Sequence, residues 1–88
     1  MKIKKGFILK EVSNQIIVVP VGEAAIKFHG MITLNETGKF LFENLKDDIS
    51  LEDLTLRLIE NYDVDPKRAY KDCEMFIELL DKHHILDK

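Results

Sequence analysis

Two different spacings of apolar residues divide the chain into a strand-rich first third and a helical remainder. Residues 7–9 and 16–19 are short apolar runs rich in β-branched and aromatic side chains, and the polar residues 13–15 lie between them, so a β-hairpin is expected. Proline has no amide to donate and glycine weakens a strand interior, so Pro20 and Gly22 should end the second strand.

Two further extended segments are expected before the first long helix. Residues 25–28 and 31–34 are short and partly apolar, and His29 and Gly30 separate them. The second segment should complete a three-stranded antiparallel sheet. The lysines at the N-terminus are followed by an apolar stretch too short for a signal peptide, so the first twelve residues are expected to form the first strand.

Three helices should follow, each with a recognisable start. Asn35 can cap a helix that runs to about residue 46. Ser50, followed three residues later by Asp53, resembles a capping box for a second helix that ends at about residue 62. The pair Asp65 and Pro66 places a cap and a proline at the start of the third helix. Apolar residues recur at helical spacing on the second helix (Leu51, Leu54, Leu58, Ile59) and on the third (Ala69, Cys73, Phe76, Ile77, Leu80).

This order predicts a single α+β domain, in which a three-stranded antiparallel sheet at the N-terminus precedes three α-helices. The short polar turn between the second and third helices is typical of a helix-turn-helix, and a small sheet beside it indicates a winged-helix-turn-helix-like fold. The sheet comes first here, whereas the hairpin of a typical winged helix comes last. The chain has 88 residues, too few for two domains with separate cores.

Composition narrows the class of protein. A hydrophobic fraction of 45% with 33% charged residues is typical of a folded, soluble domain. The net charge of -3 favours neither a nucleic-acid backbone nor an anionic membrane, and no apolar run approaches the roughly 18 residues that span a bilayer. A single cysteine cannot form an internal disulfide, which agrees with a cytoplasmic location.

The sequence offers little catalytic chemistry. Cys73 lies on the apolar stripe of the third helix and has no base placed to activate it, so it is expected in the core. His29 is expected in a loop or at a strand end. His83 and His84 are adjacent near a helix end, point about 100° apart and cannot hold one metal from the same face. We therefore expect no enzyme activity, no metal and no cofactor.

The segment LNETGKFLFENL (34–45), followed by SLEDLTLRLIENYDVDPKRAYKDCEMFIELLDKHHIL (50–86), resembles the PqqD-like family, named for the pyrroloquinoline quinone biosynthesis protein D. With the strands GFILKEV and IIVVPVG, the resemblance covers nearly the whole chain. One departure is Phe42, where the family often has tryptophan; an aromatic core residue is kept.

This resemblance implies a RiPP precursor peptide recognition element, a non-catalytic protein that binds the leader segment of a ribosomally made precursor peptide. Its partners would be that leader peptide and a modifying enzyme, commonly a radical S-adenosylmethionine (radical SAM) protein. The resemblance also implies that the leader adds as a strand beside the third strand and lies against the third helix. The family serves more than pyrroloquinoline quinone biosynthesis, so the product stays open.

Strand addition accords with the residues themselves, because an edge strand presents unpaired amide and carbonyl groups to an extended peptide. On the third helix, a second stripe is offset by one residue from the core stripe and consists of Arg68, Asp72, Met75 and Leu79. The basic residues in the first turns of this helix, Lys67, Arg68 and Lys71, could attract acidic residues of a leader. Each feature also has a purely structural interpretation. The strand could be an ordinary core strand, the methionine of the third helix could fill the core, and the basic residues could form a solvated charged face. The candidate peptide-binding residues are Met31, Ile32, Thr33, Leu34, Arg68, Lys71, Asp72, Met75 and Leu79.

Two other classes of function remain as alternatives. A DNA-binding winged helix would read with the third helix, where Lys67, Arg68 and Lys71 are basic; the acidic residues that follow would meet phosphates unfavourably. A protein-protein adaptor would need no peptide. Exposed strand edges can also pair with each other, which leaves a homodimer open.

Overall fold

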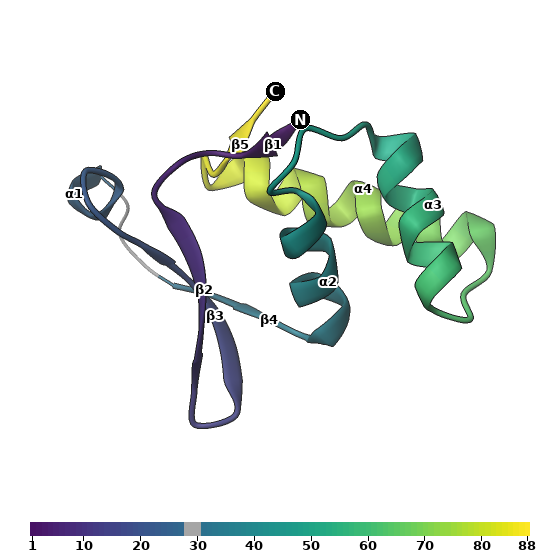
Figure 1. Ribbon diagram of the computed structural model, residues 1–88, viewed down its shortest axis with the longest axis horizontal. Coiled ribbons are helices and arrows are strands. Elements are labelled where there is room, and N and C mark those ends of the chain that lie inside the picture. The colour runs from purple at the N-terminus through teal and green to yellow at the C-terminus, as the bar shows by residue number, and fades with distance from the viewer. Residues whose placement is uncertain (28–30) are drawn as a thin grey trace.

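The computed structural model describes residues 1–27 and 31–88, and its three longer helices gather on one side of a small sheet (Figure 1). A three-stranded antiparallel sheet has the order β2-β3-β4, and a separate two-stranded ladder joins β1 to β5. The predicted α+β class and its order of sheet before helices are confirmed. The elements are β1 (Lys2–Ile3), β2 (Phe7–Val12), β3 (Gln15–Pro20), α1 (Ala24–Lys27), β4 (Ile32–Leu34), α2 (Glu36–Asn44), α3 (Leu51–Asn61), α4 (Pro66–Lys82) and β5 (Leu86–Asp87).

The hairpin of β2 and β3 forms as the sequence predicts. Val12 pairs with Gln15, so the turn has two residues, Ser13 and Asn14, with φ of 50° and 66°. Two consecutive left-handed residues make the tight turn whose twist matches that of antiparallel strands, and asparagine tolerates this conformation. β3 ends at Pro20, as expected.

The prediction of a strand at residues 25–28 is wrong. Ala24–Lys27 forms the short helix α1, and residue 28 lies outside the described residues. The carbonyls of Gly22 and Glu23 accept from the amides of Ala25 and Ile26, so the chain coils locally after the left-handed turn at Gly22. Alanine favours helix, and among the described residues no strand pairs with this segment. His29, expected in a loop or at a strand end, also lies outside the described residues.

The N-terminal segment contains two strands where one was expected. The extended conformation is interrupted at Gly6, whose φ is 97°. A Cβ at this position would lie 2.9 Å from the Cβ of Ala24. Before this break, β1 pairs with β5 at the other end of the sequence, and Ile3 donates its amide to the carbonyl of Leu45. This ladder depends on contacts between distant segments, which no local pattern reveals.

The predicted helix starts are confirmed. The side chains of Asn35, Ser50 and Asp65 accept hydrogen bonds from the first-turn amides of α2, α3 and α4, respectively. α2 ends at Asn44, short of the predicted residue 46, because the carbonyl of Leu45 turns away to accept from β1.

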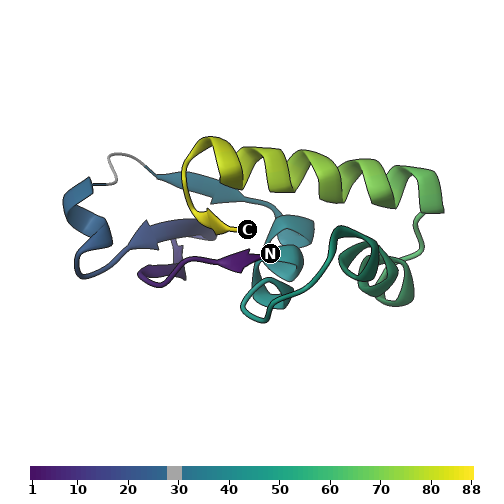
Figure 2. The same ribbon diagram turned by 90° about the horizontal axis from the view of Figure 1, so that it is seen from above.

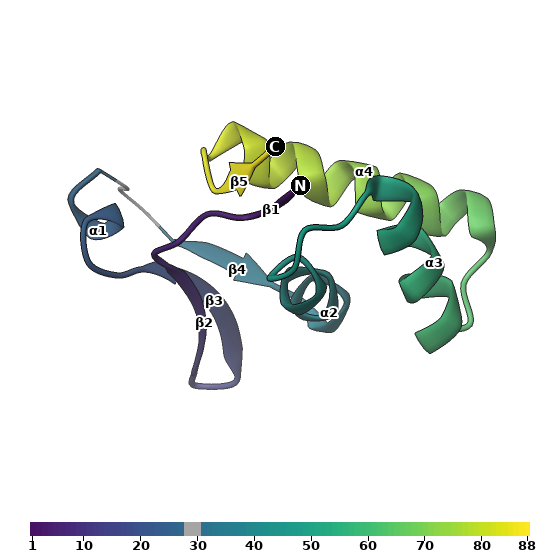
Figure 3. The same cartoon turned by 45° about the horizontal axis from the view of Figure 1, so that its top comes forward.

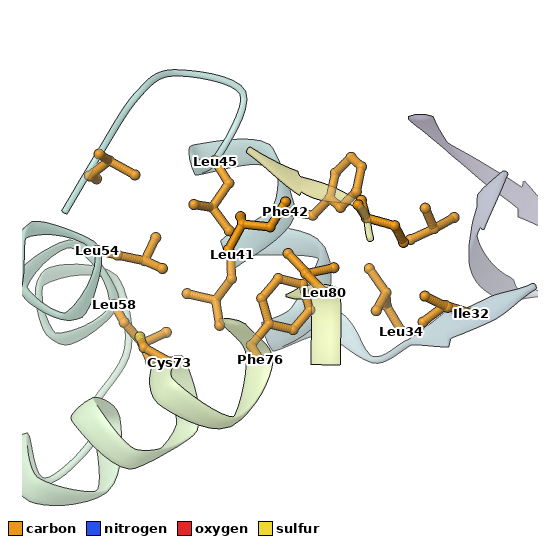
Figure 4. Packing of buried hydrophobic residues seen from close by; sticks show 14 of the residues in the cluster. Ile32, Leu34, Leu41, Phe42, Leu45, Leu54, Leu58, Cys73, Phe76 and Leu80 are labelled. Carbon is orange, nitrogen blue, oxygen red and sulfur yellow. The ribbon is translucent and has the colours of Figure 1, made fainter. Parts of the chain in front are cut away.

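The hydrophobic core is centred on α2, which lies between β4 and α3 in two views (Figures 1 and 3). Phe42 and Leu45 are fully buried there. Around them pack the predicted apolar stripes of α3 and α4 and the inner face of the sheet (Figure 4). The labelled core residues in Figure 4 are Ile32, Leu34, Leu41, Phe42, Leu45, Leu54, Leu58, Cys73, Phe76 and Leu80.

Candidate peptide-binding groove

β4 is an edge strand. Its residues Ile32, Thr33 and Leu34 pair with Val18, Ile17 and Ile16 of β3, and within the described residues no strand pairs with its other side. Because side chains alternate along a strand, Ile32 and Leu34 point into the core and Thr33 points outward. β4 therefore keeps one side of its backbone open to an additional strand.

A groove of about 600 Å³ lies between the end of β4, the start of α2 and one face of α4. In Figure 2, β4 and α4 lie toward the same, upper edge of the molecule. Because β4 ends where α2 begins, the strand edge and the first turn of α2 form one side of the groove, and α4 forms the other. The lining residues are Thr33, Leu34, Asn35, Thr37, Gly38, Leu41, Arg68, Asp72, Met75, Phe76 and Leu79.

The face of α4 toward the groove is a stripe beside the core stripe. Ala69, Cys73 and Leu80 are fully buried, whereas Met75, one position before Phe76, is 57% exposed. Leu79 is partly buried and packs against the core. Met75 is thus surface, and Leu79 lies at the boundary between core and groove. A flexible thioether at such a surface can adapt to side chains of different shape.

The charged end of the groove lies near the start of α4. Arg68 Nε lies 4.0 Å from Asp72 Oδ2, and the Arg68 side chain is 78% exposed. An exposed pair at this distance contributes little to stability, so both side chains are able to exchange partners. The groove is therefore polar beside Arg68 and Asp72, and apolar beside Met75 and Leu79.

Six of the nine candidate residues line this groove, namely Thr33, Leu34, Arg68, Asp72, Met75 and Leu79. The other three lie outside its lining. Met31 is 70% exposed just before β4, Ile32 points into the core, and Lys71 lies on the exposed surface of α4. Because the Ile32 side chain is buried, any contact of Ile32 with a peptide along the strand edge would be made through its backbone.

Five lining residues were absent from the sequence-based set: Asn35, Thr37, Gly38, Leu41 and Phe76. Two of these were expected to be structural, and they are: Asn35 caps α2 and Phe76 is buried, as Leu41 is too. A Cβ on Gly38 would lie 3.2 Å from the Leu34 Cβ, so glycine lets the first turn of α2 approach the end of β4. The sequence did offer one clue to the missed residues within 35–38: they directly follow the strand whose edge was proposed to bind the peptide.

The single cysteine of the chain does not line the groove. Cys73 is fully buried, and desolvation raises the pKa of its thiol above the ordinary value of 9.0, against a hydrogen bond with Thr55 that lowers it. The thiol is therefore held protonated. No cluster of three or more metal-binding side chains occurs within residues 1–27 and 31–88.

The surface charge of α4 disfavours the DNA-binding alternative. The exposed residues Glu74, Glu78 and Asp81 place negative charge along α4, which would repel phosphates if this helix entered a DNA groove. None of the helices in the described part of the chain is long and apolar enough to cross a membrane.

The fold and the groove define a small α+β domain with an open strand edge beside an apolar helix face. Residues 14–86 match the family described as "Coenzyme PQQ synthesis protein D (PqqD)", and the chain belongs to this family. The resemblance inferred from the sequence is thereby confirmed.

Two solved structures are similar to the chain throughout. One is "TbiB1 in Complex with the TbiA(beta) Leader Peptide", with a TM-score of 0.75 and 16% identity over 99% of this chain and 95% of that one. The other is "Lasso peptide synthetase B1 complexed with the leader peptide", with a TM-score of 0.70 and 16% identity over 92% of this chain and 89% of that one. At this identity the similarity shows the fold. A search of curated protein sequences found no match.

Proposed function

We propose that this protein is a non-catalytic recognition element that binds the leader segment of a ribosomally made precursor peptide in the groove between β4 and α4. The observation that carries the proposal is the open edge of β4 beside the exposed Met75. Membership of the PqqD family supports it, as does the leader peptide present in both similar structures.

Strand addition explains how such a groove would combine affinity with sequence specificity. The leader backbone would pair with β4, and alternate side chains would enter the groove. From Arg68 to Leu79, α4 rises about 16 Å, the length of about five residues of extended peptide. Such a segment would turn three side chains toward the groove, and we expect a polar one beside Arg68 and Asp72 and two apolar ones beside Met75 and Leu79.

The second partner would be a modifying enzyme to which the bound leader is presented. The family resemblance described above implies a modifying enzyme that is commonly a radical SAM protein. The single cysteine, which cannot form an internal disulfide, agrees with a cytoplasmic location. Co-purification of the enzyme with the recognition protein, with and without precursor, would separate a peptide-presenting role from that of a simple adaptor. An enzyme retained equally well without any precursor would favour the adaptor.

The direct test is an isothermal calorimetric titration of the protein with the precursor peptides encoded beside its gene. We expect saturable binding of one peptide through its leader segment. Hydrogen exchange should then slow at the β4 amides that do not bond to β3, because the added strand satisfies them. Failure of every neighbouring peptide to bind would contradict the proposed function.

A further inference from the structure

A second cavity, of about 480 Å³, lies at the other end of α4. It is formed by the link between β1 and β2, by α1 and by the C-terminal end of α4, which point toward the same end of the molecule in Figures 1 and 3. Its lining residues are Lys4, Lys5, Phe7, Glu23, Ala24, Lys27, His83 and His84. We call this cavity the basic pocket.

The basic pocket concentrates positive charge on a protein whose net charge is -3. Lys4, Lys5 and Lys27 line it together with one carboxylate, that of Glu23. The four ion pairs of the described residues involve none of these four side chains. Three lysines and the apolar side chain of Phe7 thus line the same cavity, and none of the four ion pairs neutralises a lysine there.

Residues that line the two cavities follow one another near the C-terminal end of α4. Leu79 lines the groove, and His83, the C-cap of α4, lines the basic pocket. The amide of His83 donates to the carbonyl of Leu79, so the two residues lie one helical turn, about 6 Å, apart along the axis. Chain connectivity gives a second constraint, because Lys27 lies four residues before Met31, a span of at most about 14 Å. An extended peptide leaving the groove at its Leu79 end would reach the basic pocket within a few residues.

We propose that the basic pocket binds an acidic stretch of the same leader peptide, directly beyond the segment that pairs with β4. This inference rests on the proposed function and names a recognition element outside the groove. Charge decides the class of occupant: carboxylates of aspartate or glutamate would pair with Lys4, Lys5 and Lys27, and Glu23 would disfavour a basic peptide. The leader would therefore be read twice, by apolar contacts in the groove and by charge in the basic pocket.

Hexaglutamate tests the pocket independently of any precursor. In a titration followed by amide chemical shifts at about 50 mM salt, we expect saturable changes at residues lining the basic pocket and none at Met75 or Thr33. At about 500 mM salt, where the screening length falls to about 4 Å, these changes should disappear. No saturable change at low salt, or equal changes over the whole surface, would overturn the proposal.

Charge reversal supplies the matched controls. Each of Lys4→Glu, Lys5→Glu and Lys27→Glu should weaken hexaglutamate binding by about two- to five-fold. Lys10→Glu makes the same change on an exposed strand position outside the basic pocket and should have no effect. Equal weakening by Lys10→Glu would show that the peptide responds only to net charge, which contradicts a site.

Variants of the leader test whether its acidic residues occupy the basic pocket. Once a precursor is found that binds, replacing the acidic residues beside its groove-binding segment with serine should weaken binding to the wild type more than binding to Lys4→Glu, which keeps Lys5 and Lys27. A leader whose affinity depends on neither its acidic residues nor Lys4 would overturn this inference while the proposed function stands. Hexaglutamate binding without any effect of the leader's acidic residues would also overturn it. Absence of any leader binding would instead contradict the proposed function.

Discussion

Met75→Asp is the sharpest test of the groove. Full burial of a methionine side chain contributes about 1.5–3 kcal/mol, and Met75 is 57% exposed, so a bound peptide could gain roughly 1–1.5 kcal/mol by covering the remainder. Aspartate would remove this gain and place a carboxylate against apolar peptide side chains. The combined loss of binding free energy should be about 2 kcal/mol, or about 30-fold in Kd.

The fold should tolerate this change, and α3 offers a matched control. Leu56 is 55% exposed on α3 and does not line the groove, so Leu56→Asp makes the same kind of change at nearly the same exposure. Each variant should lose only about 0.5 kcal/mol of helix propensity, which lowers Tm by a few degrees in a domain of this size.

Two outcomes would refute this reasoning. Equal peptide affinity of Met75→Asp and Leu56→Asp, measured by calorimetry, would show that the peptide does not use this face of α4. A much larger fall in Tm for Met75→Asp than for Leu56→Asp, measured by circular dichroism, would show that Met75 is part of the core.

Three further predictions concern the frame that holds the groove. Asn35→Ala should lower the free energy of unfolding by about 1 kcal/mol, because the first turn of α2 loses its cap, and thermal unfolding unchanged from the wild type would contradict this role. Gly6→Ala should cost about 2 kcal/mol or more, since φ is 97° and the added methyl would lie 2.9 Å from a neighbouring Cβ. Gly22→Ala, with φ of 61° and open space around it, should cost about 1 kcal/mol. Urea unfolding of both variants measures these costs, and equal costs would exclude the close approach at Gly6. Cys73 should resist iodoacetamide at neutral pH in the folded protein and react only on unfolding. Because burial raises the pKa of this thiol above 9.0, the unfolded chain ionises first as pH rises past that value, so wild-type stability should fall relative to Cys73→Ala. Fast alkylation of the native protein would contradict the assigned burial.

Local patterns in the sequence were enough to predict most of the helical half and the family. Caps such as Asn35 and Ser50 depend on a side chain and an amide three residues away, so their signals are local. The stripe containing Cys73 and Leu80 follows from helical periodicity in the same way. The family resemblance likewise depends on order and spacing along the chain.

The remaining features could not be predicted from the sequence, because they depend on contacts between segments that are distant in sequence. The pairing of β1 with β5 joins the two ends of the chain. Residues 25–27 had a composition compatible with a strand, but the turn at Gly22 leads them into a helix. Periodicity could not tell whether Met75 fills the core or lies beside a groove, since Met75 and Leu79 each come one position before a core residue, Phe76 and Leu80, and all four are apolar. The packing of α4 on α2 and α3 decided it, because that packing buries one stripe and leaves the other facing the open edge of β4.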